Sequence, residues 1–309
     1  MKYGVWLMEN LTEESELFLA KQDNFNIFGP ESSPKAEALH AIVARGKSIV
    51  DQHLIKSLPN LQVISKCGVG LDSIDVDFAS SNGIQVLNTP GVNSDSVAEH
   101  TLSFILMLQR KMHTASSEVR KGNWNYRNQY SGDEIRDKTL GILGMGEIGQ
   151  RVATLATCFG MKVQYWNRSE KSVPYGFRSL EQLIETSDII SIHLPLSPAT
   201  KGLINKESIR KMKKGVLLIN TARNGIIEEN ALIDSLKSGS IGGYAADVPF
   251  VDPPGSDHPL LAFENVLFTP HSSSLTKRTF DEICQLASMN VVSFLRGEKV
   301  EQRYKANEW

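Results

Sequence analysis

The chain has 309 residues, 41% of them hydrophobic and 22% charged, and 33 basic against 35 acidic residues leave a formal charge of −2. This length suggests about two domains, and the charge balance gives no reason to expect nucleic acid or an anionic membrane as a partner. No apolar run approaches the roughly 20 residues of a membrane span. The three cysteines lack metal-site spacing, and the apolar stretch 4–8 is too short for a secretory signal, so we expect no metal site and a cytoplasmic location.

Short β-branched or apolar runs alternate with stretches of helical spacing, which predicts an α/β fold with parallel sheets covered on both faces. The expected strands are residues 3–8, 41–43, 63–66, 85–87, 139–143, 162–166, 189–193, 215–220, 243–247 and 266–269. The expected helices include residues 94–121, 147–159, 179–186, 206–212, 228–235 and 280–295. The polar segment 122–138 is expected to be a long loop.

The strands divide the chain into two α/β units. Residues 1–99 carry strands but no glycine-rich fingerprint, and the last helix is expected to return to them, so that residues 1–99 and 286–309 form one domain. Residues 100–285 form the second domain, which carries the fingerprint.

A glycine-rich turn predicts a dinucleotide site in the second domain. Gly144, Gly146 and Gly149 form a GxGxxG pattern between an expected strand and an expected helix that begins with Glu147 and Ile148. In such a motif the first glycine permits the tight turn, the second lets the backbone approach a pyrophosphate, and the third lets the helix pack on the strand. The helix N-terminus then offers free N–H groups to the phosphates.

The end of the next strand distinguishes NAD from NADP. Asn167 stands where an acidic residue would bind the ribose of NAD and repel a 2′-phosphate, and Arg168 and Ser169 follow it. A guanidinium and a hydroxyl suit a phosphate, so the sequence favours NADP. The alternative is NAD, with Arg168 stacked on adenine and Asn167 bonded to an unmodified ribose.

Several further phrases, in this order and spacing, resemble the D-2-hydroxyacid dehydrogenases, and most closely those of the phosphoglycerate dehydrogenase type. They are Gly68-Val69-Gly70-Leu71-Asp72, Asn88-Thr89-Pro90-Gly91, Val97-Ala98-Glu99-His100, His193-Leu194-Pro195, Asn220-Thr221-Ala222-Arg223, Ala246-Asp247-Val248 and Thr269-Pro270-His271. The resemblance covers nearly the whole chain. It implies two Rossmann-like, doubly wound domains with a cleft between them, a homodimer formed through the region 94–138, and a first domain that binds the substrate.

The resemblance also implies the catalytic residues. Arg223 corresponds to the arginine that binds the carboxylate of a 2-oxo acid and polarises its oxo group, and a fixed cation there stabilises the alkoxide that hydride transfer creates. His271 corresponds to the general acid and base, and histidine side chains commonly titrate near neutral pH. The N–H groups of Val69 and Gly70 correspond to further carboxylate ligands.

The remaining implied positions concern the nicotinamide and the histidine. Asp247 corresponds to a contact of the carboxamide, while the residues around the cofactor are Leu194, Pro195, Thr221 and Ala222. The family normally has a glutamate that orients the histidine, and here Asp252, one methylene shorter, falls at that position. Asp252 is therefore expected to serve His271, or else only to cap a proline-rich turn. His100 and His193 are expected to be packing or supporting residues.

The sequence leaves the substrate open. Arg45 and Lys47 are candidates for a phosphate group, which favours 3-phosphoglycerate and 3-phosphohydroxypyruvate, whereas glyoxylate or hydroxypyruvate needs no such cation. A non-catalytic, dinucleotide-sensing corepressor on the same fold is the alternative of another class. Retention of Arg223, His271 and a carboxylate at Asp252 favours the enzyme.

Overall fold

The computed structural model describes residues 2–46, 48–248, 250 and 255–308. The chain forms two compact units, one made of residues 1–93 and 275–309 and the other of residues 94–274. These limits differ from the expected 99/100 and 285/286 because two helices remain whole: α4 (Ser94–Gln109) lies in the second unit and α10 (Lys277–Leu295) in the first. Among the described residues, no helix combines the length and apolar character needed to cross a membrane.

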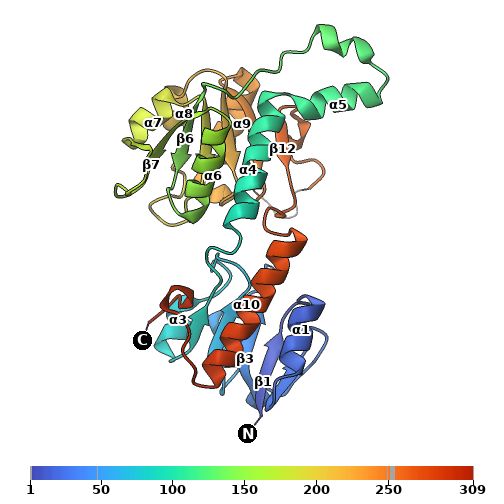
Figure 1. Ribbon diagram of the computed structural model, residues 1–309, viewed down its shortest axis with the longest axis vertical. Coiled ribbons are helices and arrows are strands. Elements are labelled where there is room, and N and C mark those ends of the chain that lie inside the picture. Colours follow the sequence, from blue (N-terminus) through green and yellow to red (C-terminus); the bar gives the residue numbers. More distant parts are fainter. Residues whose placement is uncertain (1, 47, 249, 251–254, 309) are drawn as a thin grey trace. The chain divides into compact units, whose positions relative to one another are not determined.

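The first unit is built on a five-stranded parallel sheet in the order β2-β1-β3-β4-β5. The central strand β3 is buried at every position, as expected for a parallel strand covered on both faces. Helix α10 packs against β3, β4 and α1, and Figure 1 shows it lying along this sheet. The elements are β1 (Tyr3–Leu7), α1 (Glu13–Ala20), β2 (Phe25–Phe28), η1 (Ala36–Ala38), β3 (Leu39–Ala44), α2 (Gln52–Lys56), β4 (Val63–Lys66), α3 (Val76–Ser81), β5 (Gln85–Leu87), α10 and η5 (Gln302–Tyr304).

The second unit is built on a seven-stranded parallel sheet in the order β12-β11-β10-β9-β6-β7-β8. The strand order reverses at β6, which is the arrangement of doubly wound dinucleotide-binding sheets. Helices α4 and α6 pack together, and α4 also contacts β10 and β11 (Figure 1). The elements are α4, α5 (Met112–Arg120), η2 (Trp124–Asn128), β6 (Thr139–Leu143), α6 (Glu147–Cys158), β7 (Lys162–Trp166), β8 (Gly176–Phe177), α7 (Leu180–Thr186), β9 (Ile189–Ile192), α8 (Lys206–Lys211), β10 (Val216–Asn220), η3 (Asn224–Ile226), α9 (Glu229–Ser238), β11 (Ile241–Ala246), η4 (Pro259–Ala262) and β12 (Val266–Phe268).

The expected fold class and strand positions are confirmed, whereas the expected continuous helix over residues 94–121 is wrong. The helix ends at Gln109, and α5 begins after Lys111, whose φ of 47° is left-handed. The buried face of α4 ends with Leu108, and α5 has no buried residue, so packing supports only the first helix. Helix α5 and the segment after it extend beyond the seven-stranded sheet in Figure 1.

Candidate active site

The expected cofactor residues and two of the expected catalytic residues follow strands of the seven-stranded sheet. The carboxyl ends of parallel strands meet at one edge, and ligands of such sheets bind at that edge where the strand order reverses. Here the reversal is at β6, between β7 and β9. The residues that follow these strands are Gly144, Gly146, Glu147, Ile148, Gly149, Asn167, Arg168, Ser169, Leu194, Pro195, Thr221, Ala222, Arg223, Asp247 and His271.

The glycine loop after β6 has the local geometry of a phosphate cradle. Gly144 has φ of 101°, and a Cβ there would lie 2.5 Å from the carbonyl oxygen of His193. A Cβ at Gly146 would meet nothing within 4 Å, so the loop is open at that position. Helix α6 begins at Glu147 without a side-chain cap, which leaves its first N–H groups available to an anion. These features fit the pyrophosphate of a dinucleotide.

The end of β7 lies beside this loop, because the N–H of Gly144 donates to the carbonyl oxygen of Trp166 at 2.9 Å. Asn167 follows directly and donates from Nδ2 to the carbonyl oxygen of Ser169 at 3.1 Å. Arg168 and Ser169 are exposed. In a sheet of this topology, the adenosine ribose of a dinucleotide would bind after this strand. The neutral side chain of Asn167 and the exposed Arg168 are the groups that would meet the ribose and its 2′ substituent.

The turn after β9 contributes a neutral histidine. His193 Nε2 lies 2.8 Å from the hydroxyl of Ser191, and burial lowers the pKa of His193 to about 3. The imidazole is therefore uncharged near neutral pH. Leu194 is buried, whereas Pro195 is exposed at the edge of the sheet.

Asn220 shapes the turn that carries Arg223. The buried amide of Asn220 accepts from the N–H of Ala222 at 3.0 Å and donates to the carbonyl oxygen of Arg223 at 2.9 Å. The half-buried Arg223 side chain donates to the carbonyl oxygen of Ala222 at 2.8 Å. Thr221 lies 3.0 Å from the hydroxyl of Thr101 on α4. The arginine is thus presented on a turn that is fixed at several points.

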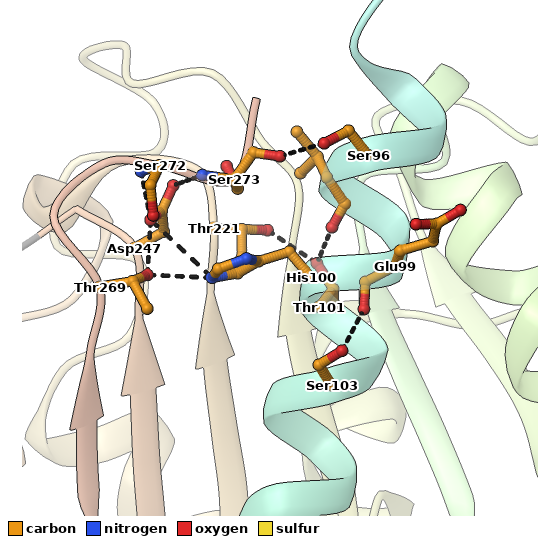
Figure 2. A network of polar contacts seen from close by, with 11 residues as sticks. Ser96, Glu99, His100, Thr101, Ser103, Thr221, Asp247, Thr269, Ser272 and Ser273 are labelled. Atoms are coloured by element: carbon orange, nitrogen blue, oxygen red, sulfur yellow. Dashed lines mark hydrogen bonds and ion pairs between the residues drawn. The ribbon is translucent and has the colours of Figure 1, made fainter. Parts of the chain in front are cut away.

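Asp247 organises the turn 269–273, which carries His271, and Figure 2 shows its contacts with Thr269, Ser272 and Ser273. The carboxylate accepts from the hydroxyl of Thr269 at 2.5 Å and from the N–H groups of Ser272 at 2.8 Å and Ser273 at 2.9 Å. Burial raises the pKa of the Asp247 carboxyl, but the hydrogen bonds from Ser273, Thr269 and Ser272 lower it more, so the pKa lies below its ordinary value. The group is therefore a stable carboxylate at neutral pH.

His271 itself is exposed and has a left-handed backbone with φ of 53°. Its N–H donates to the carbonyl oxygen of Asp247 at 2.8 Å. Left-handed backbone is uncommon for residues other than glycine and requires support from its surroundings. The exposed imidazole and the braced backbone together suit a group that exchanges a proton with a bound molecule.

The first unit presents two N–H groups after β4. The loop is held by Asn88, which donates to the carbonyl oxygen of Val69 at 3.0 Å, and by Thr89, whose hydroxyl accepts from the N–H of Gly68 at 2.9 Å. Within the described part of the chain, the N–H groups of Val69 and Gly70 have no acceptor. They are therefore available to an anion such as a carboxylate.

Arg45 follows β3, the neighbour of β4, and so lies at the same edge of its sheet as that loop. Its guanidinium lies 4.4 Å from the ring centre of Phe280 and donates to the carbonyl oxygen of Asn10. Lys47 and Asp252 lie outside the described residues. Among those that are described, no group of three or more His, Cys, Asp or Glu side chains is arranged to hold a metal ion.

The residues that surround the Asp247 carboxylate could not be assigned from the sequence. Thr269, Ser272 and Ser273 flank the expected histidine, but only the fold reveals that they all bond to the same carboxylate. His100 contacts Thr269, so the phrases that contain His100 and His271 meet in space. The sequence signal for this contact was that both phrases, the one with His100 and the one with His271, belong to the family pattern.

Residues 102–273 match the family model described as "D-isomer specific 2-hydroxyacid dehydrogenase, NAD binding domain". A glyoxylate reductase of Aeropyrum pernix is 40% identical over 85% of this chain and 81% of its own length. A D-3-phosphoglycerate dehydrogenase of Bacillus subtilis is 36% identical over 96% of this chain, which spans 57% of that protein. The solved D-lactate dehydrogenase of Aquifex aeolicus, complexed with NAD and lactic acid, is 28% identical over 96% of each chain, with a TM-score of 0.86.

Proposed function

Because the chain belongs to the D-isomer specific 2-hydroxyacid dehydrogenases, a family of nicotinamide-dependent oxidoreductases, we propose that it interconverts a small 2-oxo acid and its D-2-hydroxy acid. One observation carries the proposal: the open glycine loop, the turn of Arg223 and the turn of His271 share the carboxyl edge of one sheet. The unit 94–274 binds the dinucleotide, and the unit formed by 1–93 and 275–309 binds the substrate.

Arg223 and His271 carry the chemistry of the chain itself. A bound nicotinamide dinucleotide supplies the hydride for reduction. Arg223 binds the substrate carboxylate and polarises the oxo group, so that its fixed charge stabilises the developing alkoxide. The imidazolium of His271 donates its proton to that oxygen, and the neutral imidazole takes a proton in the reverse direction. In the first unit, the N–H groups of Val69 and Gly70 are available to a substrate carboxylate.

The residues around β6 to β11 hold the dinucleotide. The N–H groups at Gly146, Glu147, Ile148 and Gly149 bind the pyrophosphate. Asn167, Arg168 and Ser169 bind the adenosine ribose and favour NADP over NAD, because the guanidinium is exposed and no acidic side chain occupies position 167. The nicotinamide pocket is lined by Leu194, Pro195, Thr221, Ala222 and Asp247.

The first candidate substrate is phosphorylated: 3-phosphohydroxypyruvate in the direction of reduction. Arg45 supports it, since this cation lies at the same sheet edge as Val69 and Gly70. The second candidate is glyoxylate or hydroxypyruvate. Two observations favour it: the Arg45 guanidinium is already engaged by Phe280 and Asn10, and the glyoxylate reductase of A. pernix matches over most of both chains.

A substrate panel tests the function. Glyoxylate, hydroxypyruvate and 3-phosphohydroxypyruvate are each reduced with NADPH and with NADH, and the configuration is determined for the two chiral products, glycerate and 3-phosphoglycerate. We expect turnover, with a D-product from the two larger substrates, and we expect Arg223→Ala to lower kcat/KM by about 10³-fold or more. If Arg45 binds phosphate, Arg45→Ala raises KM for the phosphorylated substrate alone. Absence of turnover in the whole panel contradicts the proposed function.

We also propose a cytoplasmic homodimer. Cys67, Cys158 and Cys284 are free thiols, which suits a reducing compartment. Helix α5 and the following segment carry exposed apolar side chains, including Val119 at 52% and Trp124 at 67% exposure. A second copy of the chain would cover them. The molar mass in solution, measured for the wild type and for Val119→Asp, tests this assembly.

A further inference from the structure

Helix α4 contacts the turn 269–273 at two points, through Ser96 and His100 (Figure 2). Ser96 donates from its hydroxyl to the carbonyl oxygen of Ser273, and His100 Nε2 lies 2.9 Å from the hydroxyl oxygen of Thr269. Residues 96 and 100 are four positions apart, so they share one face of the helix. The turn is thus attached to α4 before and after His271.

The direction of the His100 hydrogen bond follows from counting protons. The hydroxyl of Thr269 has one proton and donates it to the Asp247 carboxylate at 2.5 Å. Toward His100 it therefore acts as the acceptor. His100 must carry a proton on Nε2, and this nitrogen is too far from the nearer Asp247 oxygen, at 3.9 Å, for a direct hydrogen bond. The order of donation is His100 to Thr269 to Asp247.

The Asp247 carboxylate determines the path of the next turn. The carboxylate oxygens accept hydrogen bonds from the N–H groups of Ser272 and Ser273. The backbone carbonyl oxygen of Asp247 accepts the N–H of His271. The N–H groups of three successive residues, 271 to 273, are therefore directed at Asp247. The first of these residues is His271, whose backbone is left-handed. A carboxylate free to rotate would release two of these bonds and with them the backbone on which the imidazole is carried.

We propose that His100 is a positioning residue for the reaction: as an Nε2–H donor it fixes Thr269, and through Thr269 the Asp247 carboxylate that keeps His271 in place. The inference rests on the proposed role of His271 as the acid and base. The ring of His100 also packs edge-on against Phe104, with centroids 4.6 Å apart, so a test must separate the donor from the packing.

Matched variants make this separation. His100→Phe keeps an aromatic ring beside Phe104 and removes the donor, whereas His100→Gln restores an N–H near the position of Nε2. Thr269→Val removes the relaying hydroxyl at nearly constant shape, and Thr269→Ser retains it. For each variant we would measure kcat, KM for the 2-oxo acid, the Kd of the reduced dinucleotide, and Tm.

Displacement of a catalytic group by about 1 Å can lower a rate by about 100-fold. We expect His100→Phe and Thr269→Val each to lower kcat by about 10- to 100-fold, with KM and Kd within about threefold of wild type. The double variant should be no worse than either single variant, because both break the same chain of hydrogen bonds. His100→Gln and Thr269→Ser should recover most of the lost kcat.

Two results would overturn the inference: wild-type kcat in both His100→Phe and Thr269→Val, or equal losses in His100→Phe and His100→Gln, because the restored N–H donor would then have no effect. If His100→Phe does not fold, the comparison of Thr269→Val with Thr269→Ser decides by the same criterion. His271→Asn separates this inference from the proposed function. If that variant keeps the wild-type kcat, the role of His271 is wrong and both proposals fail. If it loses kcat while His100→Phe and Thr269→Val do not, only the present inference fails.

Discussion

Gly149 lies directly against the carbonyl oxygen of Gly144: a Cβ at position 149 would be 2.1 Å from that oxygen. The contact closes the glycine loop onto the first turn of α6. Gly146, between them, faces open space. The same added methyl group therefore tests packing at one position and ligand binding at the other.

We expect Gly149→Ala to lower the free energy of unfolding by about 1–3 kcal/mol, because backbone must move to admit the methyl group. Gly146→Ala should leave the stability within about 0.5 kcal/mol of wild type and should weaken dinucleotide binding. Denaturant unfolding and dinucleotide titration measure the two effects. Unchanged dinucleotide affinity in Gly146→Ala would argue against a pyrophosphate at this loop.

Cofactor choice is expected to depend on Arg168. A charge-assisted hydrogen bond to phosphate contributes about 1.5–3 kcal/mol, so Arg168→Ala should lower kcat/KM for NADPH by about 10- to 150-fold and leave NADH nearly unaffected. Asn167→Asp should also shift the preference from NADPH toward NADH, because the added carboxylate repels the 2′-phosphate. A wild-type enzyme that prefers NADH would show that Arg168 has another role.

His193 predicts how stability varies with pH. Its pKa is lowered to about 3 in the folded chain, so between that pH and about 6.5 the unfolded chain binds a proton that the folded chain does not. The contribution of His193 to stability is present above about pH 6.5 and decreases as the pH falls, by at most about 1.4 kcal/mol per pH unit. His193→Gln should have a shallower dependence in urea unfolding between pH 7.5 and 5. Parallel curves for the two proteins would contradict the neutral imidazole.

Asp252 lies outside the described residues, and its pairing with His271 stays a prediction from the sequence. A neighbouring carboxylate favours the imidazolium, which is the form needed for reduction. Asp252→Asn should therefore lower the pH at which reductive kcat/KM declines, with dinucleotide binding nearly unchanged. Asp252→Ala should cost more, since it also removes a hydrogen-bond acceptor. An unaltered pH profile with full activity in Asp252→Asn would assign the residue to the turn alone.

The sequence predicted the sheets well because their central strands are short, mostly apolar runs, such as β9 and β10, which are buried throughout. It missed β2 and β8, which are edge strands with only partial burial. The glycine loop was predicted because its residues are adjacent in the chain. The bond between His100 and Thr269 was not, because it spans 169 positions and depends on how α4 packs against the sheet.

Because His271 has a left-handed backbone, the side chain that activity requires at this position is not the one that favours stability. An imidazole is needed there for proton transfer, but its Cβ is disfavoured at a φ of 53°, by about 1–2 kcal/mol in regular left-handed backbone. Asparagine tolerates this conformation better. Random mutagenesis selected for heat resistance alone should therefore recover His271→Asn, a variant with a Tm at or above that of wild type and little turnover. Selection for turnover should exclude it, so the residue would be retained at the expense of a more stable fold.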